Sequence, residues 1–184
     1  MIKSFHRTPF IVLAGVIAFA LHWTFEYRQT QQYEQSKDHI KLQILHINDL
    51  HANYYPTHFW GQNHKISPLA LIKGFVQSKQ NKYQNSLFVS AGDAMEKGSV
   101  VEYLSGGRST IEIYEQLGLD LLTLGNHDFA YGLDTSAEFS NRGAKQTLSA
   151  NLQFPPQTKS ATQAYKIFDV QGVKIGFLGL TAAP

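Results

Sequence analysis

The chain of 184 residues contains no cysteine, so it can form neither disulfide bonds nor thiolate metal sites. Any metal ion must therefore be held by oxygen and nitrogen ligands. The net charge at pH 7 is only +2, and no basic patch with interleaved aromatic residues occurs, so we expect no nucleic acid partner. A composition typical of disorder is also absent, because 43% of the residues are hydrophobic, enough for one domain with a core.

Long apolar runs are also scarce, and the run at the N-terminus covers residues 10–25. His22 and Thr24 interrupt it, so it falls short of the roughly 20 apolar residues of a membrane span. A positively charged segment precedes it, with Lys3, His6 and Arg7. A charged segment followed by a short apolar run is typical of a secretory signal.

We therefore predict a signal peptide or signal anchor over residues 1–28 and a glutamine-rich linker over residues 29–39. The tripeptide Ala18-Phe19-Ala20 fits a cleavage site, whereas the apolar residues 21–25 favour an uncleaved anchor in the cytoplasmic membrane. By either route the rest of the chain would be exported, to the periplasm or the extracellular side. The alternative is a buried N-terminal helix of a cytosolic protein.

The remaining residues, 40–184, alternate strand and helix signals and are predicted to form one domain. The predicted strands are Lys41–Ile47, Leu87–Ala91, Leu119–Leu124 and Thr147–Asn151. The predicted helices are Pro68–Gln77, Ile111–Leu117 with Ser109 as its N-cap, and Ala137–Arg142. Two further strands, Tyr165–Val170 and Val173–Leu178, flank Gln171-Gly172 and predict a hairpin. This alternation predicts an α/β fold with a parallel sheet.

Polar residues with metal-binding side chains follow three of the predicted strands, each of which is apolar enough to be buried. They are Asp49 and His51 after the first strand, Asp93 after the second, and Asn126 and His127 after the third. Ligands of open α/β sheets bind outside the carboxyl ends of the strands. The three segments are therefore predicted to share one metal site.

The ligand types restrict the metal. A carboxylate and an imidazole on one ion suit Zn, Mn, Fe or Co better than Ca. Asp49 and His51 are two residues apart and project to the same side if the strand continues through them. Taken singly, the pattern Asp-x-His is commonly incidental and Gly92-Asp93 is an ordinary turn, but the ordered set of motifs argues against coincidence. His46 is predicted to lie in the core.

At these residues the chain resembles a calcineurin-like metallophosphoesterase, and more closely the 5′-nucleotidase family. The resemblance runs from about Lys41 to Pro184. It includes Asp93-Ala94-Met95-Glu96-Lys97-Gly98-Ser99, Gly118-Leu119-Asp120, Ala150-Asn151-Leu152 and the stretch from Lys174 to Thr181. The family fold is a four-layer α/β/β/α sandwich, of which this chain would form an incomplete, N-terminal part. The resemblance places the final hairpin at the start of the second sheet.

The resemblance also implies a role for each motif residue. Two divalent ions would be bound, with Asp49 and His51 as ligands, Asp93 bridging both ions, and Asn126 on the second ion. His127 and Asn126 would face the substrate phosphate, with His127 as the catalytic residue. The implied reaction is metal-assisted hydrolysis of a nucleotide, or another phosphate ester, to an alcohol such as a nucleoside and phosphate.

Two departures from the family pattern leave other functions open. No histidine follows His127, so the later metal-ligating histidines of the family are missing and at most one ion would be well held. Ala130 stands where the nucleotidases commonly have an aspartate that orients the motif histidine, and Asp128 is expected only to cap the next segment. The alternatives are a membrane-tethered module that binds metal or phosphate without turnover, a truncated fragment, and a site completed by a second chain.

Overall fold

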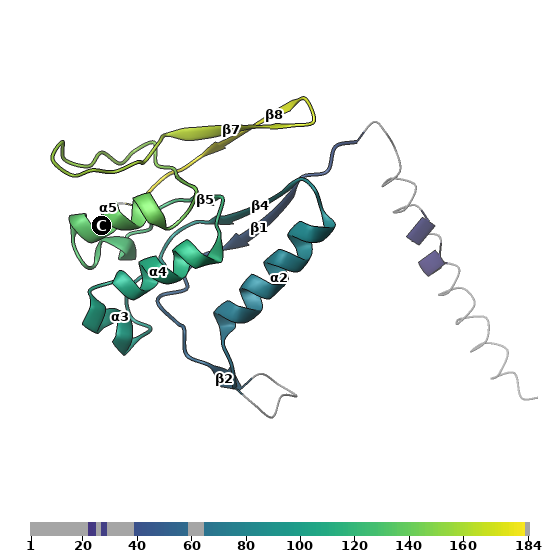
Figure 1. Cartoon of the computed structure of the whole chain (residues 1–184). Coiled ribbons are helices and arrows are strands. Elements are labelled where there is room, and N and C mark those ends of the chain that lie inside the picture. The colour runs from purple at the N-terminus through teal and green to yellow at the C-terminus, as the bar shows by residue number, and fades with distance from the viewer. Residues whose placement is uncertain (1–21, 25–26, 29–38, 59–64, 183–184) are drawn as a thin grey trace, which may run out of the picture. The chain divides into compact units, whose positions relative to one another are not determined.

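The computed structural model describes residues 22–24, 27–28, 39–58 and 65–182 (Figure 1). The chain divides into two units, residues 1–41 and 42–184. In the first unit, residues 22–24 and 27–28 are helical, and the predicted signal segment and linker otherwise lie outside the described residues. Within the described ranges, no helix has the length and apolar character needed to span a bilayer.

The centre of the second unit is a parallel sheet with the strand order β1-β4-β5-β6. Its strands are β1 (Gln43–Ile47), β4 (Ser86–Ser90), β5 (Leu121–Leu122) and β6 (Gln146–Thr147). Because all of the pairs are parallel, the carboxyl ends of these strands meet at one edge. The predicted α/β fold with a parallel sheet is thus confirmed. A small antiparallel pair, β2 (Thr57–His58) with β3 (Lys65–Ile66), lies outside this sheet.

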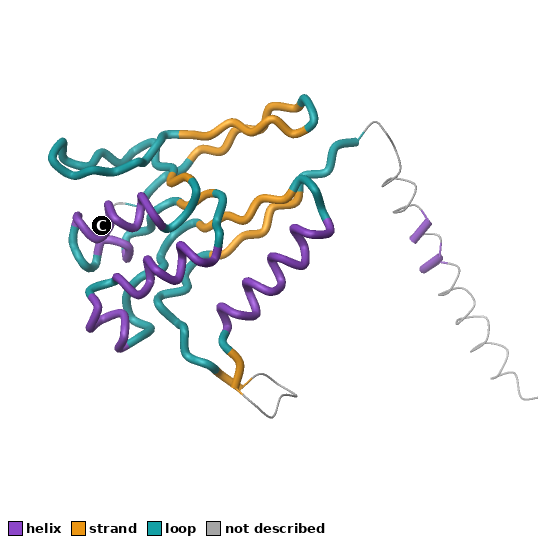
Figure 2. Tube along the Cα trace, viewed as in Figure 1, coloured by secondary structure: helices purple, strands orange, loops and turns teal. Residues whose placement is uncertain are grey.

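Four helices connect the strands: α2 (Pro68–Lys82), α3 (Val100–Ser105), α4 (Arg108–Leu117) and α5 (Leu133–Arg142). Fully buried residues of β4, α4 and α5 make the main core. Phe88 of β4 belongs to this cluster, and Tyr114 of α4 packs edge-on against Phe139 of α5 with ring centroids 5.2 Å apart. The helices therefore cover one face of the sheet, as Figure 2 shows for α2 and α4.

The first strand differs from the prediction of a buried strand. Ile44 is 50% exposed and His46 is also exposed, because burial alternates along β1 and these two side chains project from the face away from the core that Leu45 and Ile47 contact. His46 therefore lies at the surface, and its predicted place in the core is wrong. The third strand is shorter than predicted, although its flanking residues Leu119 and Leu124 are fully buried.

The turn between α3 and α4 also corrects the sequence prediction. Gly106 and Gly107 both have left-handed backbone conformations, with φ of 59° and 83°, and Gly107 is the N-cap of α4. Ser109 lies inside the helix and is not its cap. The helix α3 was not predicted, although Ser99 caps it by accepting a hydrogen bond from the Val101 N–H at 3.2 Å.

The hairpin of β7 (Tyr165–Val170) and β8 (Val173–Leu178) has the predicted bounds. Gln171 and Gly172 both have positive φ, 54° and 91°, as the tight hairpin turn requires. In Figure 1 the hairpin runs on the side of the parallel sheet opposite α2 and α4. The described residues thus form a helix layer, a sheet and a hairpin, and the full four-layer sandwich stays a prediction.

Candidate metal centre

The loops that follow β1 and β4 run side by side beyond the ends of the strands. The N–H of Asp49 donates to the Gly92 carbonyl at 3.1 Å, and the N–H of His51 donates to the Asp93 carbonyl at 3.0 Å. A third bond joins Ala52 to Ala94 at 2.7 Å. This pairing brings the two predicted metal-binding segments together at the carboxyl edge of the sheet.

The backbone of these loops has positive φ at several residues that are not glycine, four of them in the segments that pair with each other. The φ angles of Asp49, His51, Ala52 and Asp93 lie between 46° and 54°. Such conformations are uncommon for side-chain-bearing residues and cluster at functional sites. The assumption that the strand continues through Asp49 and His51 is therefore wrong. The two side chains nevertheless lie near each other, with 3.8 Å between Asp49 Oδ1 and His51 Nε2.

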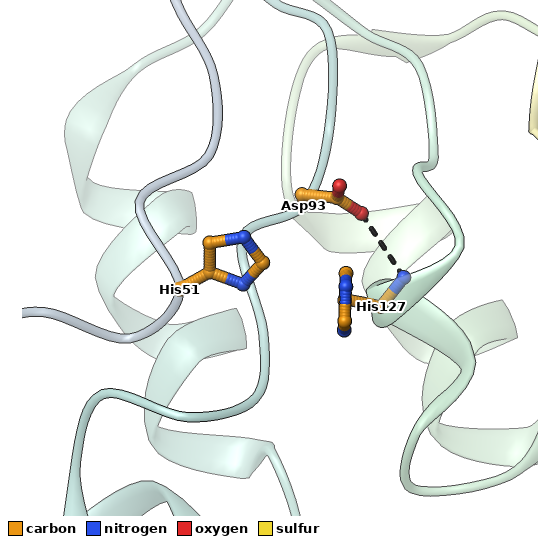
Figure 3. Close-up of side chains that lie close together, drawn as sticks. All are labelled: His51, Asp93 and His127. Atoms are coloured by element: carbon orange, nitrogen blue, oxygen red, sulfur yellow. Dashed lines mark hydrogen bonds between the residues drawn. The ribbon is translucent and has the colours of Figure 1, made fainter.

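Figure 3 shows the side chains of His51, Asp93 and His127 converging from three separate loops. Each offers a ligand atom, and these atoms all lie within 4.8 Å of one another. Asp49 stands beside this group at the exposed rim, and its side chain is 56% exposed. Asn126 is exposed at the N-terminal end of η1 (His127–Phe129), where it makes no side-chain capping bond. The structure therefore gathers His51, Asp93 and His127, with Asp49 beside them and Asn126 next to His127 in the chain, while the role of each residue stays a prediction.

The ring of His51 has the orientation expected of a metal ligand. Its Nδ1 lies 3.1 Å from the carbonyl oxygen of Met95. Because a carbonyl only accepts, Nδ1 carries the proton, and the lone pair of Nε2 remains available. Metal-ligating histidines are commonly oriented by such a bond from the second ring nitrogen. Nitrogen from His51 and oxygens from Asp93, Asp49 and Asn126 form a donor set that fits Zn, Mn, Fe or Co.

The carboxylate of Asp93 is held against the third loop. Its Oδ1 accepts the His127 N–H at 3.0 Å, the contact drawn in Figure 3. Gly125 makes this approach possible, because a Cβ at that position would come within 2.7 Å of the Asp93 backbone nitrogen and closer still to its carboxylate. Gly92 has the same function from the other side, since its Cβ would collide with the backbone at Gly125.

Both ring nitrogens of His127 have polar neighbours. Nδ1 lies 2.5 Å from Glu96 Oε2, and Nε2 lies 3.3 Å from Lys97 Nζ. An ammonium group only donates, so Nε2 accepts and Nδ1 carries the proton that is given to Glu96. This hydrogen bond from His127 lowers the pKa of Glu96 below its usual value. The rings of His127 and His51 meet edge-on with centroids 4.7 Å apart.

Asp128 has a larger structural role than the predicted capping of the next segment. It is fully buried and accepts backbone N–H bonds from Asp93, Ala94, Met95 and Gly125 at 2.8–3.2 Å. Burial raises its pKa to about 6, against the opposing effect of the hydrogen bonds. Asp128 therefore ties the second loop to the third. Sequence reasoning missed this because three of its four partners, Asp93, Ala94 and Met95, lie more than 30 residues away.

Glu102 in α3 is a second residue that sequence reasoning missed. It is 1% exposed, and its carboxylate accepts the N–H of Glu96 with both oxygens at 3.1 Å. Thr110 and Tyr131 also donate to it, each at 3.0 Å. Burial is the largest cause of the raised pKa of Tyr131, followed by this bond. The spacing of Ser99 and Glu102 is that of a capping box, a signal that could have drawn attention to Glu102.

Comparison with known proteins identifies a family and several relatives. A family model described as calcineurin-like phosphoesterase matches residues 42–181. Endonuclease YhcR of Bacillus subtilis is 29% identical over an alignment of 174 positions that covers 85% of this chain and 14% of that protein. The NAD 5′-nucleotidase of Haemophilus influenzae is 30% identical over an alignment of 186 positions that covers 96% of this chain and 29% of that protein.

The solved structure of Haemophilus influenzae NAD nucleotidase (NadN) has the same fold. It matches with a TM-score of 0.64 and 30% sequence identity, over 76% of this chain and 26% of that one. The chain thus spans less than a third of the length of each of these relatives, in the N-terminal part of a 5′-nucleotidase-type domain. Since the family model covers all three loops of the metal centre, the chain belongs to the calcineurin-like phosphoesterase family.

Proposed function

We propose that the chain carries the metal-binding part of a phosphoric-ester hydrolase that converts nucleotides to nucleoside and phosphate. The observation that carries this proposal is the convergence of His51, Asp93 and His127, within 4.8 Å, at the carboxyl edge of the sheet. The printed name of the Haemophilus influenzae relative, NAD 5′-nucleotidase, supports a nucleotide as the substrate. The endonuclease among the relatives also acts on phosphate esters, so it supports the same bond type.

Four side chains would hold the divalent ions. Asp93 offers two oxygens and would serve both ions, with His51 and Asp49 as further ligands of one ion and Asn126 as a ligand of the other. When bound, such ions supply an activated water and offset the negative charge of the phosphate. The His127 N–H donates to one oxygen of Asp93 and so holds this carboxylate in place.

His127 and Lys97 would act on the phosphate ester directly. The Nε2 atom of His127 faces the Lys97 ammonium at 3.3 Å, at a position that a phosphate oxygen could share with both groups. Lys97 is exposed and would add positive charge toward the phosphate. With a proton on Nε2 as well, His127 would donate a hydrogen bond to the developing charge, or that proton to the leaving oxygen.

The test is phosphate release from AMP by the full chain, purified in detergent and supplied with Mn²⁺ or Zn²⁺. Asp93→Ala removes the proposed bridging carboxylate, and Asp134→Ala is the matched control, because Asp134 is exposed on α5. Turnover that is lost in Asp93→Ala and kept in Asp134→Ala supports the proposal. A folded protein that binds metal and is stabilised by phosphate, yet releases none from AMP, would instead be the binding module.

We also propose that the chain is exported. The charged residues Lys3 and Arg7 before the apolar run at residues 10–25 support this, as does the cleavage-site pattern at residues 18–20. Sequencing the N-terminus of the protein isolated from fractionated cells tests it. A mature chain that starts at Leu21 indicates a cleaved signal, and an intact chain in the membrane fraction indicates an anchor. An intact chain in the cytosol would contradict export.

A further inference from the structure

We propose that Glu96 is the residue that positions the catalytic imidazole of His127, and that the buried Glu102 holds Glu96 in place; this inference rests on the proposed function. Glu96 comes from the loop after β4, whereas His127 opens η1 after β5. The carboxylate and the imidazole therefore belong to different loops. The fold brings the two side chains together, and neither sequence motif alone includes both residues.

The contact between the two side chains is short. Glu96 Oε2 lies 2.5 Å from His127 Nδ1, so the ring N–H donates a charge-assisted hydrogen bond to the carboxylate. A carboxylate on one ring nitrogen fixes the tautomer and the ring plane, and it stabilises the imidazolium that forms when the other nitrogen takes up a proton. Here that other nitrogen is Nε2, which faces Lys97 and the site. Glu96 therefore bonds to Nδ1 and leaves Nε2 free to act on the substrate, as a group that positions the ring must do.

The backbone at Glu96 is held in an unusual conformation. Glu96 and Lys97 have φ of 67° and 78°, which is unfavourable for residues with a side chain. The fully buried carboxylate of Glu102 directs both oxygens at the N–H of Glu96. Gly98 adds a second restraint, because any side chain there would collide with the backbone of Ala52. The loop is therefore held at two points, at Glu96 by the carboxylate of Glu102 and at Gly98 by its close approach to the backbone of Ala52.

Position 130 shows why a carboxylate from elsewhere is needed. Ala130 follows His127 by one turn of η1, and its N–H donates to the His127 carbonyl at 3.1 Å. Residues three apart in such a turn lie over each other, so a carboxylate at position 130 would reach the same ring, but a methyl group cannot bond to it. Within the described part of the chain, Glu96 is the carboxylate that bonds to the His127 ring. Ala130 is exposed, so an aspartate there has space.

The experiment compares the full-length wild-type protein with three variants in the phosphate-release assay with AMP. Glu96→Gln keeps the shape of the side chain and removes its charge. The double variant Glu96→Gln/Ala130→Asp supplies a carboxylate from the other position. Glu112→Gln is the matched control, since Glu112 is exposed on α4. We expect Glu96→Gln to lower kcat about 100-fold with little change in KM, which is the size of a general acid–base contribution.

The double variant is expected to regain most of the lost kcat, and Glu112→Gln is expected to match the wild type. A purely structural role of Glu96 would not be rescued by a carboxylate at position 130. An unchanged kcat in Glu96→Gln, a change confined to KM, or a loss that Ala130→Asp does not repair would each overturn the inference.

A second readout keeps the inference separate from the proposed function. The ¹⁵N chemical shifts of the His127 ring, assigned by comparison with His127→Asn, report which nitrogen carries the proton. We expect protonated Nδ1 in the wild type, a tautomer mixture in Glu96→Gln, and recovery in the double variant, whether or not the protein turns over AMP. Identical ring shifts in the wild type and Glu96→Gln would refute the positioning role, whereas absent turnover with the expected shifts would count only against the proposed function.

Discussion

The replacement of Gly125 by alanine tests how tightly the metal centre is built. The added Cβ would come within 2.7 Å of both the Asp93 backbone nitrogen and its carboxyl carbon, and nearer still to Oδ1. Real Cβ atoms essentially never approach other atoms closer than 3.0 Å, so the loop that carries Asp93 must shift. Since the Asp93 backbone is itself bound to His51 and Asp128, the movement cannot be confined to one flexible side chain.

Two quantities follow from this collision. Forcing an extra methyl group into a filled site costs roughly 1–3 kcal/mol of unfolding free energy. In a chain of this size each kcal/mol corresponds to about 2–4 °C in Tm, so we expect a fall of about 2–12 °C. The Asp93 carboxylate must move by about 1 Å, and a misplacement of that size can cost about 100-fold in rate. We therefore expect weaker Mn²⁺ binding and a kcat about 100-fold lower.

Gly176→Ala is the control for this prediction. Gly176 lies in β8 with no positive φ, and nothing would lie within 4 Å of a Cβ there. We expect its Tm to change by less than about 2 °C, as for surface substitutions away from special features. Metal binding is measured by calorimetry, Tm by circular dichroism, and kcat by phosphate release. If Gly125→Ala binds Mn²⁺ and turns over like Gly176→Ala, the close approach of the two loops is not needed for the site.

The effects of two further substitutions, and of a change in pH on one of them, can be predicted from the described residues. Asp128→Ala leaves four buried or half-buried N–H groups without their acceptor, so we expect at least about 4 kcal/mol of destabilisation in urea melts, and a loss below about 1 kcal/mol would contradict the role of this carboxylate. Burial raises the pKa of Asp128 from 3.8 to about 6, so the folded state holds a proton that the unfolded state releases between these values. The stability from this group is therefore full below about pH 3.8 and is lost as the pH rises to 6, and the gap between the wild type and Asp128→Ala should be wider at pH 4 than at pH 7.5, by at most about 3 kcal/mol. Gly74→Ala in the middle of α2 meets nothing within 4 Å, so a stabilisation of about 0.5–1 kcal/mol should raise Tm, and a lower Tm would contradict the helix geometry.

The fold could be predicted wherever its signals are local. The hairpin bounds followed from strand alternation around Gln171-Gly172, and the parallel sheet followed from the alternation of helices and strands. The exposure of His46 could not be predicted in the same way. The strand carries no local signal for which of its faces is covered, and His46 lies on the face of β1 away from the core that Leu45 and Ile47 contact.

The residues of the candidate site also differ in whether a local sequence signal predicts them. The groups with ligand chemistry, such as Asp93 and His127, could be found because each directly follows an apolar strand. The residues that hold these groups could not, because their partners are distant in the sequence: Asp128 binds the backbone at Asp93, 35 positions away. The left-handed backbone of Asp49 and His51 was also hidden, since it depends on hydrogen bonds to the neighbouring loop.

The substitution at position 130 illustrates what this division means for reading departures from a family pattern. Judged from the sequence, Ala130 argues for a disoriented His127 and therefore for a weakened site. In the structure the ring of His127 has a carboxylate partner all the same, because Glu96 reaches its Nδ1 from the loop after β4. A missing residue in a motif removes a function only if no other element can bring the same chemical group to the same atom. Here the buried Glu102 fixes the backbone of Glu96 at the position where this is possible, so the departure at Ala130 does not by itself favour a binding module over an enzyme.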